Sequence, residues 1–113
     1  MMLFEEVLKK VRERSYRIVQ LKEMLKILKN EGAEEIFLPY GCLNCGRAYG
    51  MEDFEKVLFV IFPEPMSTDD EDFAHEYCSG ICAGDTFSYS VLAKCRYCGH
   101  SNPFLEPEYV EDL

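Results

Sequence analysis

The sequence of 113 residues has no tryptophan, one glutamine and only two histidines. It also has no uninterrupted apolar run near the roughly 18 residues that a membrane span needs. The first fourteen residues alternate apolar and charged side chains, without the apolar core and the small-residue cleavage site of a secretory signal. Neither a membrane-spanning nor a secreted protein is therefore expected, and we predict a cytoplasmic location.

Familiar catalytic motifs are missing as well. The sequence contains no glycine-rich phosphate loop, no His-Glu-x-x-His and no Gly-x-Ser-x-Gly. The zinc deaminases combine His-x-Glu with Pro-Cys-x-x-Cys, and the pair His75 and Glu76 has the wrong spacing for that pattern. These absences favour a non-catalytic protein.

Basic residues are scarce after the first 31 positions. Residues 1–31 carry eight Lys or Arg and five Asp or Glu, a balance of +3, whereas residues 32–113 carry four and sixteen, a balance of −12. Proteins that bind nucleic acid contact phosphates through a basic face, so this charge balance disfavours a nucleic-acid partner. A protein partner is the expected one.

Six cysteines are present, and they form three close pairs. The pairs are Cys42 with Cys45, Cys78 with Cys82, and Cys95 with Cys98. The first and third share the pattern Cys-x-x-Cys-Gly, a spacing that wraps two thiolates around one tetrahedral metal ion, while the glycine permits the turn that follows. The sequence therefore predicts a metal site of Cys42, Cys45, Cys95 and Cys98.

A disulfide framework is the alternative explanation of six cysteines. It requires an oxidising compartment, which the absence of a secretory signal argues against. Some intracellular proteins of thermophiles are exceptions, and a Glu-rich sequence with little glutamine fits such a source. A disulfide between Cys78 and Cys82 thus stays open.

The N-terminal third has the period of an amphipathic helix. Its apolar residues recur at steps of three and four: Phe4, Val7, Leu8, Val11, Ile18, Leu21, Leu25 and Leu28. We expect one long helix, or two that meet at Ser15 as an N-cap, ending near Gly32. The stripe either packs on the metal-binding part of the chain or forms a helical surface for a homodimer.

Strand patterns follow the helical segment. Residues 35–40 and 86–94 each run directly into a Cys-x-x-Cys-Gly turn, and the apolar run 56–62 predicts a central, buried strand. The expected fold class is α+β, with an N-terminal amphipathic helix or helix pair before a small antiparallel sheet. We divide the chain into a helical segment (1–32), a metal-binding part (33–105) with an acidic insertion at 66–84, and an acidic tail (106–113).

The stretches Cys42-Leu43-Asn44-Cys45-Gly46 and Cys95-Arg96-Tyr97-Cys98-Gly99 resemble the knuckles of the zinc-ribbon and rubredoxin-like families. The resemblance implies two hairpin turns that hold one ion in a ribbon-like sheet. Four cysteines accept iron or zinc with almost the same geometry, and zinc is the favoured metal. The interval of 49 residues between Cys45 and Cys95 is longer than in compact members, which indicates an insertion.

A second resemblance competes with the first. The string Tyr77-Cys78-Ser79-x-x-Cys82 is similar to the second half of a treble-clef finger, which would combine Cys42 and Cys45 with Cys78 and Cys82. The ribbon pairing is preferred, because two glycines and a strand pattern leave little room for the helix that such a finger needs. On that pairing His75, Cys78 and Cys82 predict a second zinc site whose fourth ligand is unspecified.

The sequence thus predicts a small zinc-binding protein, with one or two Zn²⁺ ions, that acts as a non-catalytic interaction or adaptor module. One alternative is a rubredoxin-like iron protein that carries electrons, and another is a zinc-ribbon regulator associated with nucleic acid. A hydrolytic second site would need Glu76 or the acidic run 69–72 as base, although such runs are usually solvated loops. His100 is expected beside the first site rather than as a ligand.

Overall fold

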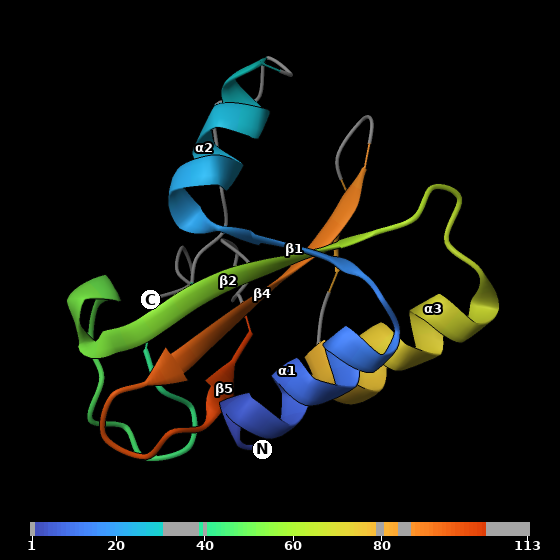
Figure 1. Ribbon diagram of the computed structural model, residues 1–113. Helices are drawn as coiled ribbons and strands as arrows, with labels where there is room; N and C mark the ends of the chain where they lie inside the picture. Colours follow the sequence, from blue (N-terminus) through green and yellow to red (C-terminus); the bar gives the residue numbers. More distant parts are fainter. Residues whose placement is uncertain (1, 31–38, 40, 79–80, 84–86, 104–113) are drawn as a thin grey trace, which may run out of the picture.

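A computed structural model confirms the α+β fold class (Figure 1). It describes residues 2–30, 39, 41–78, 81–83 and 87–103, with only the backbone at 82 and 83. The elements are α1 (Phe4–Glu13), β1 (Arg17–Gln20), α2 (Leu21–Asn30), the 3₁₀ helix η1 (Met51–Asp53), β2 (Phe54–Phe62), α3 (Thr68–Phe73), the π-helical turn η2 (Ala74–Cys78), β3 (Cys82–Ala83), β4 (Ser88–Cys95) and β5 (Ser101–Asn102).

The strands form one antiparallel sheet in the order β1-β2-β4-β3, with β5 also paired to β4. The pairing of β2 with β4 runs from Phe54 opposite Cys95 to Phe62 opposite Ser88. Both strands are therefore interior to the sheet, which confirms the predicted central strand at 56–62. The strand predicted at 86–94 is observed as Ser88–Cys95, with Thr86 outside the described residues.

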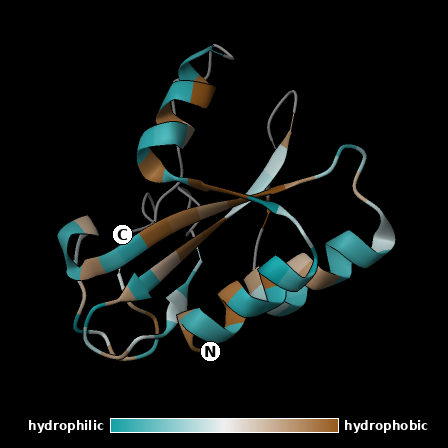
Figure 2. Cartoon of the chain, in the orientation of Figure 1, coloured by the Kyte–Doolittle hydropathy of each residue, from teal (hydrophilic) through white to brown (hydrophobic). Residues whose placement is uncertain are grey.

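Helices cover both faces of this sheet. Period-two alternation in β2 sends Val60 and Phe62 toward α1 and α3, and sends Phe59 to the opposite face, where α2 packs. The view in Figure 1 shows the same layers, with α1 and α3 on one side of the strands and α2 on the other. Hydropathy is highest along the middle of the strands (Figure 2). Because both faces are buried, most positions of β4 are apolar rather than alternating.

The apolar stripe of α1 is buried within the chain. Phe4, Val7 and Val11 are fully buried and Leu8 is 3% exposed, so the interpretation in which the stripe packs on the rest of the chain holds for this helix. In α2 only Met24 and Leu28 are buried. A homodimer formed through the N-terminal helices stays a prediction. It would have to use the apolar side chains of α2 that are not buried within the chain.

Two details of the N-terminal prediction are wrong. Ser15 is not an N-cap: its φ is 59°, and its amide bonds to the carbonyl oxygen of Arg12 at the end of α1. Ile18, assigned to the helical stripe, lies in β1 opposite Val60. Pairing with β2 decides the conformation of this segment, because its β-branched residues gain more from the ladder than from a fourth helical turn.

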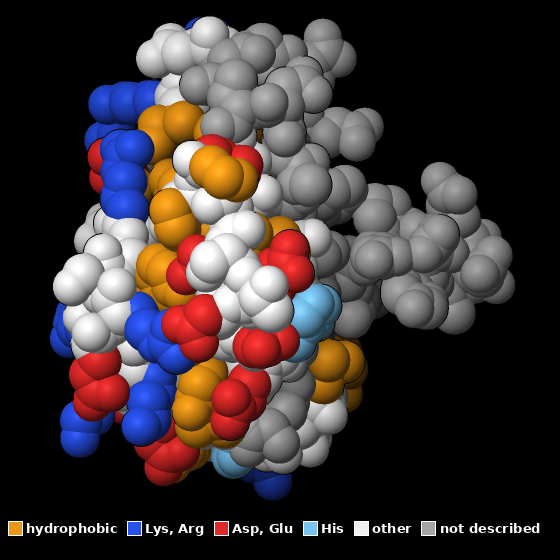
Figure 3. Space-filling model, turned by 90° about the vertical axis from the view of Figure 1, so that its right-hand side faces the viewer, with side chains coloured by type: hydrophobic (Ala, Val, Ile, Leu, Met, Phe, Trp, Pro, Cys, Tyr) orange, Lys and Arg blue, Asp and Glu red, His pale blue; other side chains and the backbone are white. Residues whose placement is uncertain are grey.

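The acidic run 69–72 is helical where a solvated loop was expected. Ser67 caps α3 by accepting a hydrogen bond from the Asp70 amide, and Asp70 accepts one from the Ser67 amide in return. The Tyr16 hydroxyl donates to Asp70 at 2.6 Å, and Arg14 pairs with Asp69. Figure 3, viewed from the side on which α3 lies, shows acidic and basic side chains intermingled. The carboxylates stabilise the helix because they lie in its first turn.

Some predictions fall outside the described residues. These are the strand at 35–40, of which only Pro39 is described, the helix end at Gly32, and the acidic tail. The division into segments also stays a prediction, although β1 from the N-terminal segment and β2 share one sheet. Among the described helices, none has both the length and the apolar character needed to cross a membrane.

Candidate metal centre

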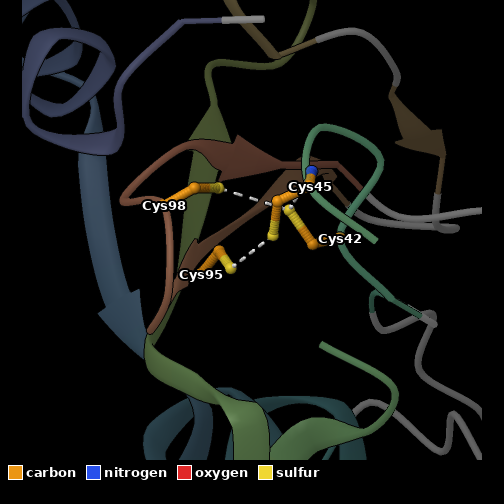
Figure 4. Close-up of side chains that lie close together, drawn as sticks. All are labelled: Cys42, Cys45, Cys95 and Cys98. Carbon is orange, nitrogen blue, oxygen red and sulfur yellow. Dashed lines mark hydrogen bonds between the residues drawn. The ribbon is translucent and has the colours of Figure 1, made fainter. Parts of the chain in front are cut away.

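Four sulfur atoms meet at one end of the sheet. Cys42, Cys45, Cys95 and Cys98 each offer a sulfur, and all four sulfurs lie within 4.8 Å of one another. The Cys42 and Cys98 sulfurs are 3.5 Å apart, and those of Cys45 and Cys95 are 3.6 Å apart (Figure 4). The structure therefore brings the first and third cysteine pairs together, as the ribbon pairing predicts.

The two turns have the same backbone geometry. In each, the glycine amide bonds to the carbonyl oxygen of the first cysteine, at 3.1 Å for Gly46 and 2.9 Å for Gly99. Both glycines have positive φ, 69° and 75°, which a residue with a Cβ rarely adopts. The amide of each first cysteine then bonds across the turn, Cys42 to Ala48 and Cys95 to His100. The glycine that both sequence patterns contain thus corresponds to the same kind of turn in the structure.

Strands position the second turn. Cys95 is the last residue of β4 and lies opposite Phe54 at the start of β2, and the chain then returns as β5. The Arg96 amide bonds to the carbonyl oxygen of Asp53, whose carboxylate accepts hydrogen bonds from the Tyr97 hydroxyl and the Tyr49 amide. Asp53 thereby fastens the second turn to the residues that follow the first.

The surroundings give two of the thiols opposite acidities. Burial disfavours the Cys42 thiolate, but hydrogen bonds from the amides of Cys45 and Asn44 and from the Asn102 side chain outweigh it and lower the pKa of Cys42 to about 6. Burial raises the pKa of Cys95 to about 12, and the amides of Cys98 and Tyr97 offset this only in part. Cys42 thus gives up its proton first, and a thiolate is the form that binds a metal.

Asn102 is a residue that the sequence analysis missed. Its side chain in β5 is fully buried, accepts a hydrogen bond from the Leu43 amide at 2.8 Å, and donates to the Cys42 sulfur at 3.5 Å and to the His100 carbonyl oxygen at 3.3 Å. One amide group therefore joins both turns and supports a thiolate. The only hint in the sequence is that an asparagine follows the second turn by a few positions.

His100 lies beside the cluster, as expected, and is outside the group of four sulfurs. Its Nδ1 is 3.1 Å from the side-chain nitrogen Nδ2 of Asn44 and 3.2 Å from the Cys98 carbonyl oxygen. The ring thus links the first turn to the second through polar contacts. These contacts fix its position next to the sulfurs.

Cys78 lies elsewhere. It is 1% exposed in the core beneath α1 and α3, and burial raises the pKa of its free thiol to about 12 despite a hydrogen bond with Ser90. The treble-clef set is therefore not assembled within the described residues. His75 is exposed, whereas Cys78 is buried, and the side chain of Cys82 lies outside the described residues. The second zinc site stays a prediction.

The four-sulfur group has the composition and spacing of a metal site. Four thiolates this close repel one another, and a divalent cation at their centre would offset that repulsion. Cys42 and Cys95 are buried, while Cys45 and Cys98 are half-buried. The cluster thus could hold one metal ion near the surface, bound by sulfur alone.

Comparison with known proteins adds no assignment. No family model, no curated protein and no solved structure matches this chain. The function of the chain is therefore inferred from its residues and their geometry.

Proposed function

We propose that this protein binds one zinc ion through Cys42, Cys45, Cys95 and Cys98, and that it serves as an interaction module for another protein. The cysteine cluster supports the first part. Four thiolates fill a tetrahedral shell, which is the composition of a structural zinc site, whereas catalytic sites keep one position for water. The ion would join the turn at residues 42–48 to the turn at residues 95–100, which follows β4.

Exposed apolar side chains around the two turns carry the second part. The large hydrophobic residues most exposed among those described are Leu3, Leu25, Leu43, Tyr49 and Tyr97. Four of these five lie near the metal centre. Leu43 and Tyr97 belong to the two turns themselves. The Tyr49 amide donates to the Asp53 carboxylate, and Leu3 forms an isolated antiparallel β-bridge with His100. Apolar groups gathered in this way are typical of a protein-binding surface, in which tyrosine is enriched.

Metal content tests the zinc proposal directly. Protein purified without added metal or chelator should carry one zinc per chain, measured by native mass spectrometry together with elemental analysis. Two zinc ions per chain would support the second site at His75, Cys78 and Cys82. Protein free of metal after such a purification would contradict the proposal.

Electron transfer by iron is a second candidate, because Cys45 and Cys98 are only half-buried and sulfurs near the surface suit that role. The same measurement separates the two metals. Iron in place of zinc, with visible absorption from sulfur-to-iron charge transfer, would favour the electron carrier. Colourless protein with stoichiometric zinc would exclude it.

The interaction surface is tested by two matched substitutions. Leu43 is 55% exposed in the first turn, and Leu25 is 49% exposed on α2, so Leu43→Ser and Leu25→Ser remove similar apolar groups from different places. We expect a partner captured by cross-linking in cell extract to be lost with Leu43→Ser, by about tenfold or more in recovery, and retained with Leu25→Ser. Equal capture by both variants, with zinc content unchanged, would move the interface away from the metal centre.

A further inference from the structure

A groove lies on the α1 face of the sheet, and at Met51 and Phe54 it reaches the residues that pack against the cysteine cluster. Its volume is about 640 Å³, and it is bounded by α1, β1, the start of α2 and the first half of β2. Ile18, Leu21 and Leu58 give it an apolar floor, and all three are only half-buried. A groove of this size has room for several side chains of an extended peptide.

The rim of the groove is basic. Arg12, Lys22 and Lys56 line it and are exposed. None of the three forms an ion pair within the described residues. The one acidic side chain in the lining, Glu55, pairs with Lys94 at 3.2 Å, so its charge is already compensated. Within the described residues, the groove thus combines three cations without an ion pair and an apolar floor, in a chain of net charge −9.

The last ten residues of this chain have the complementary chemistry. Residues 104–113 read Phe-Leu-Glu-Pro-Glu-Tyr-Val-Glu-Asp-Leu and contain no basic residue. Residues 108–113 alone supply three carboxylates, from Glu108, Glu111 and Asp112, and three apolar side chains. We propose that residues 108–113 dock in the groove of their own chain, with the carboxylates facing its three cations and the apolar side chains on its floor.

The distances allow this docking. Pro103, the last described residue, lines a depression together with Val7 of α1, and the groove begins at Leu8 and Arg12 of the same helix. To reach the groove from Pro103, the chain has to pass α1, and an α-helix is about 10 Å in diameter. Residues 104–107 span up to about 13 Å when extended, at roughly 3.3 Å per residue, so they cover that width. The inference goes beyond the proposed function, because it involves neither the turns nor the metal.

A single tryptophan tests the proposal in the full-length protein. The chain contains no tryptophan, so Tyr109→Trp introduces a unique fluorophore within the segment. We expect a blue-shifted emission maximum and acrylamide quenching several-fold weaker than in the same protein unfolded in urea. Raising the salt from about 0.05 M to 0.5 M should increase the quenching, because salt screens exposed charge pairs. An emission maximum equal to that of the unfolded protein would overturn the proposal.

Charge reversals locate the contact. Two variants are made in the Tyr109→Trp background. The first reverses the charge of the three groove cations. The second, a matched control, reverses the charge of three exposed lysines outside the groove, which also form no ion pair within the described residues. The two sets are Arg12→Glu, Lys22→Glu and Lys56→Glu, and Lys9→Glu, Lys26→Glu and Lys29→Glu. The groove set should expose the tryptophan, and the matched set should leave it protected.

Three results would contradict docking in the same chain. Equal protection in both sets would place the segment elsewhere, and equal loss in both would reduce the effect to overall charge. Protection that disappears on dilution would assign the groove to a second copy. If circular dichroism shows that the groove variant does not fold, the salt dependence of quenching in the Tyr109→Trp protein decides whether the segment is docked through its charges. Metal content measured on the same samples keeps this outcome separate from the zinc proposal.

Discussion

Cys95→Ser should lose the bound metal and with it the cooperative unfolding of the protein. Cys95 is fully buried at the end of β4, so a serine there would remove one of four ligands and leave a hydroxyl among three thiols. Structural zinc contributes an apparent free energy of about 10–16 kcal/mol in small zinc-binding peptides, which is comparable with the whole stability of a domain. Thermal melts followed by circular dichroism, combined with metal analysis, check the expectation.

Cys78→Ala is the matched control for that experiment. Cys78 is nearly as buried as Cys95 but lies in the core beneath α1 and α3. Its replacement should cost about 1 kcal/mol, as is usual for a modest core change, and leave one zinc in place. Cys95→Ser protein with full metal content and an unchanged melt would rule out the metal centre. Loss of a second metal equivalent in Cys78→Ala would restore the second site.

Asn102→Ala should weaken metal binding without removing any ligand. The substitution removes the side-chain partner of the Leu43 amide, a part-buried contact, and takes one hydrogen bond from the Cys42 sulfur. The loss of these two hydrogen bonds costs about 1–3 kcal/mol, which corresponds to roughly a fivefold to 150-fold loss of affinity where folding and metal binding are linked. Competition with a chromophoric zinc chelator gives the affinity.

A second variant separates the sulfur contact from packing. Asn102→Asp keeps the shape and the acceptor for the Leu43 amide, but a carboxylate in place of the amide nitrogen cannot donate to Cys42 and repels its thiolate. We expect it to bind metal at least as weakly as Asn102→Ala, and to raise the pH at which cobalt-thiolate absorption appears. Wild-type affinity in both variants would show that Asn102 only fills space.

The cysteine turns were predictable from sequence because their chemistry is local. Cys-x-x-Cys-Gly specifies a turn in which glycine alone takes positive φ easily, and both glycines do so here. The pairing of Cys42 and Cys45 with Cys95 and Cys98 could be inferred only through the resemblance of the two turns. The structure brings the four sulfurs together, and the register of β2 and β4 places Cys95 opposite Phe54, the first residue of β2.

The helix α1 and the strand β2 were also predictable, because the apolar residues in their sequences are the ones that face the core. The stripe from Phe4 to Val11 has a helical period and is buried as that period requires, and the continuous apolar run of β2 is buried at Phe59, Val60 and Phe62. The segment at Ile18 was misassigned because a short run of β-branched residues fits either a helix or a strand. Hydrogen bonds with β2, far away in sequence, decide between them.

Sequence alone therefore determined the two cysteine turns and the inward face of α1, because glycine conformation and apolar periodicity act over a few neighbouring residues. The tertiary structure decided which distant groups meet. It placed Asn102 between the two turns, kept Cys78 in the core apart from the group of four sulfurs, and left Arg12, Lys22 and Lys56 around one groove. These results depend on strand order and on helix placement over the sheet, which are set by the burial of the whole chain rather than by any local pattern.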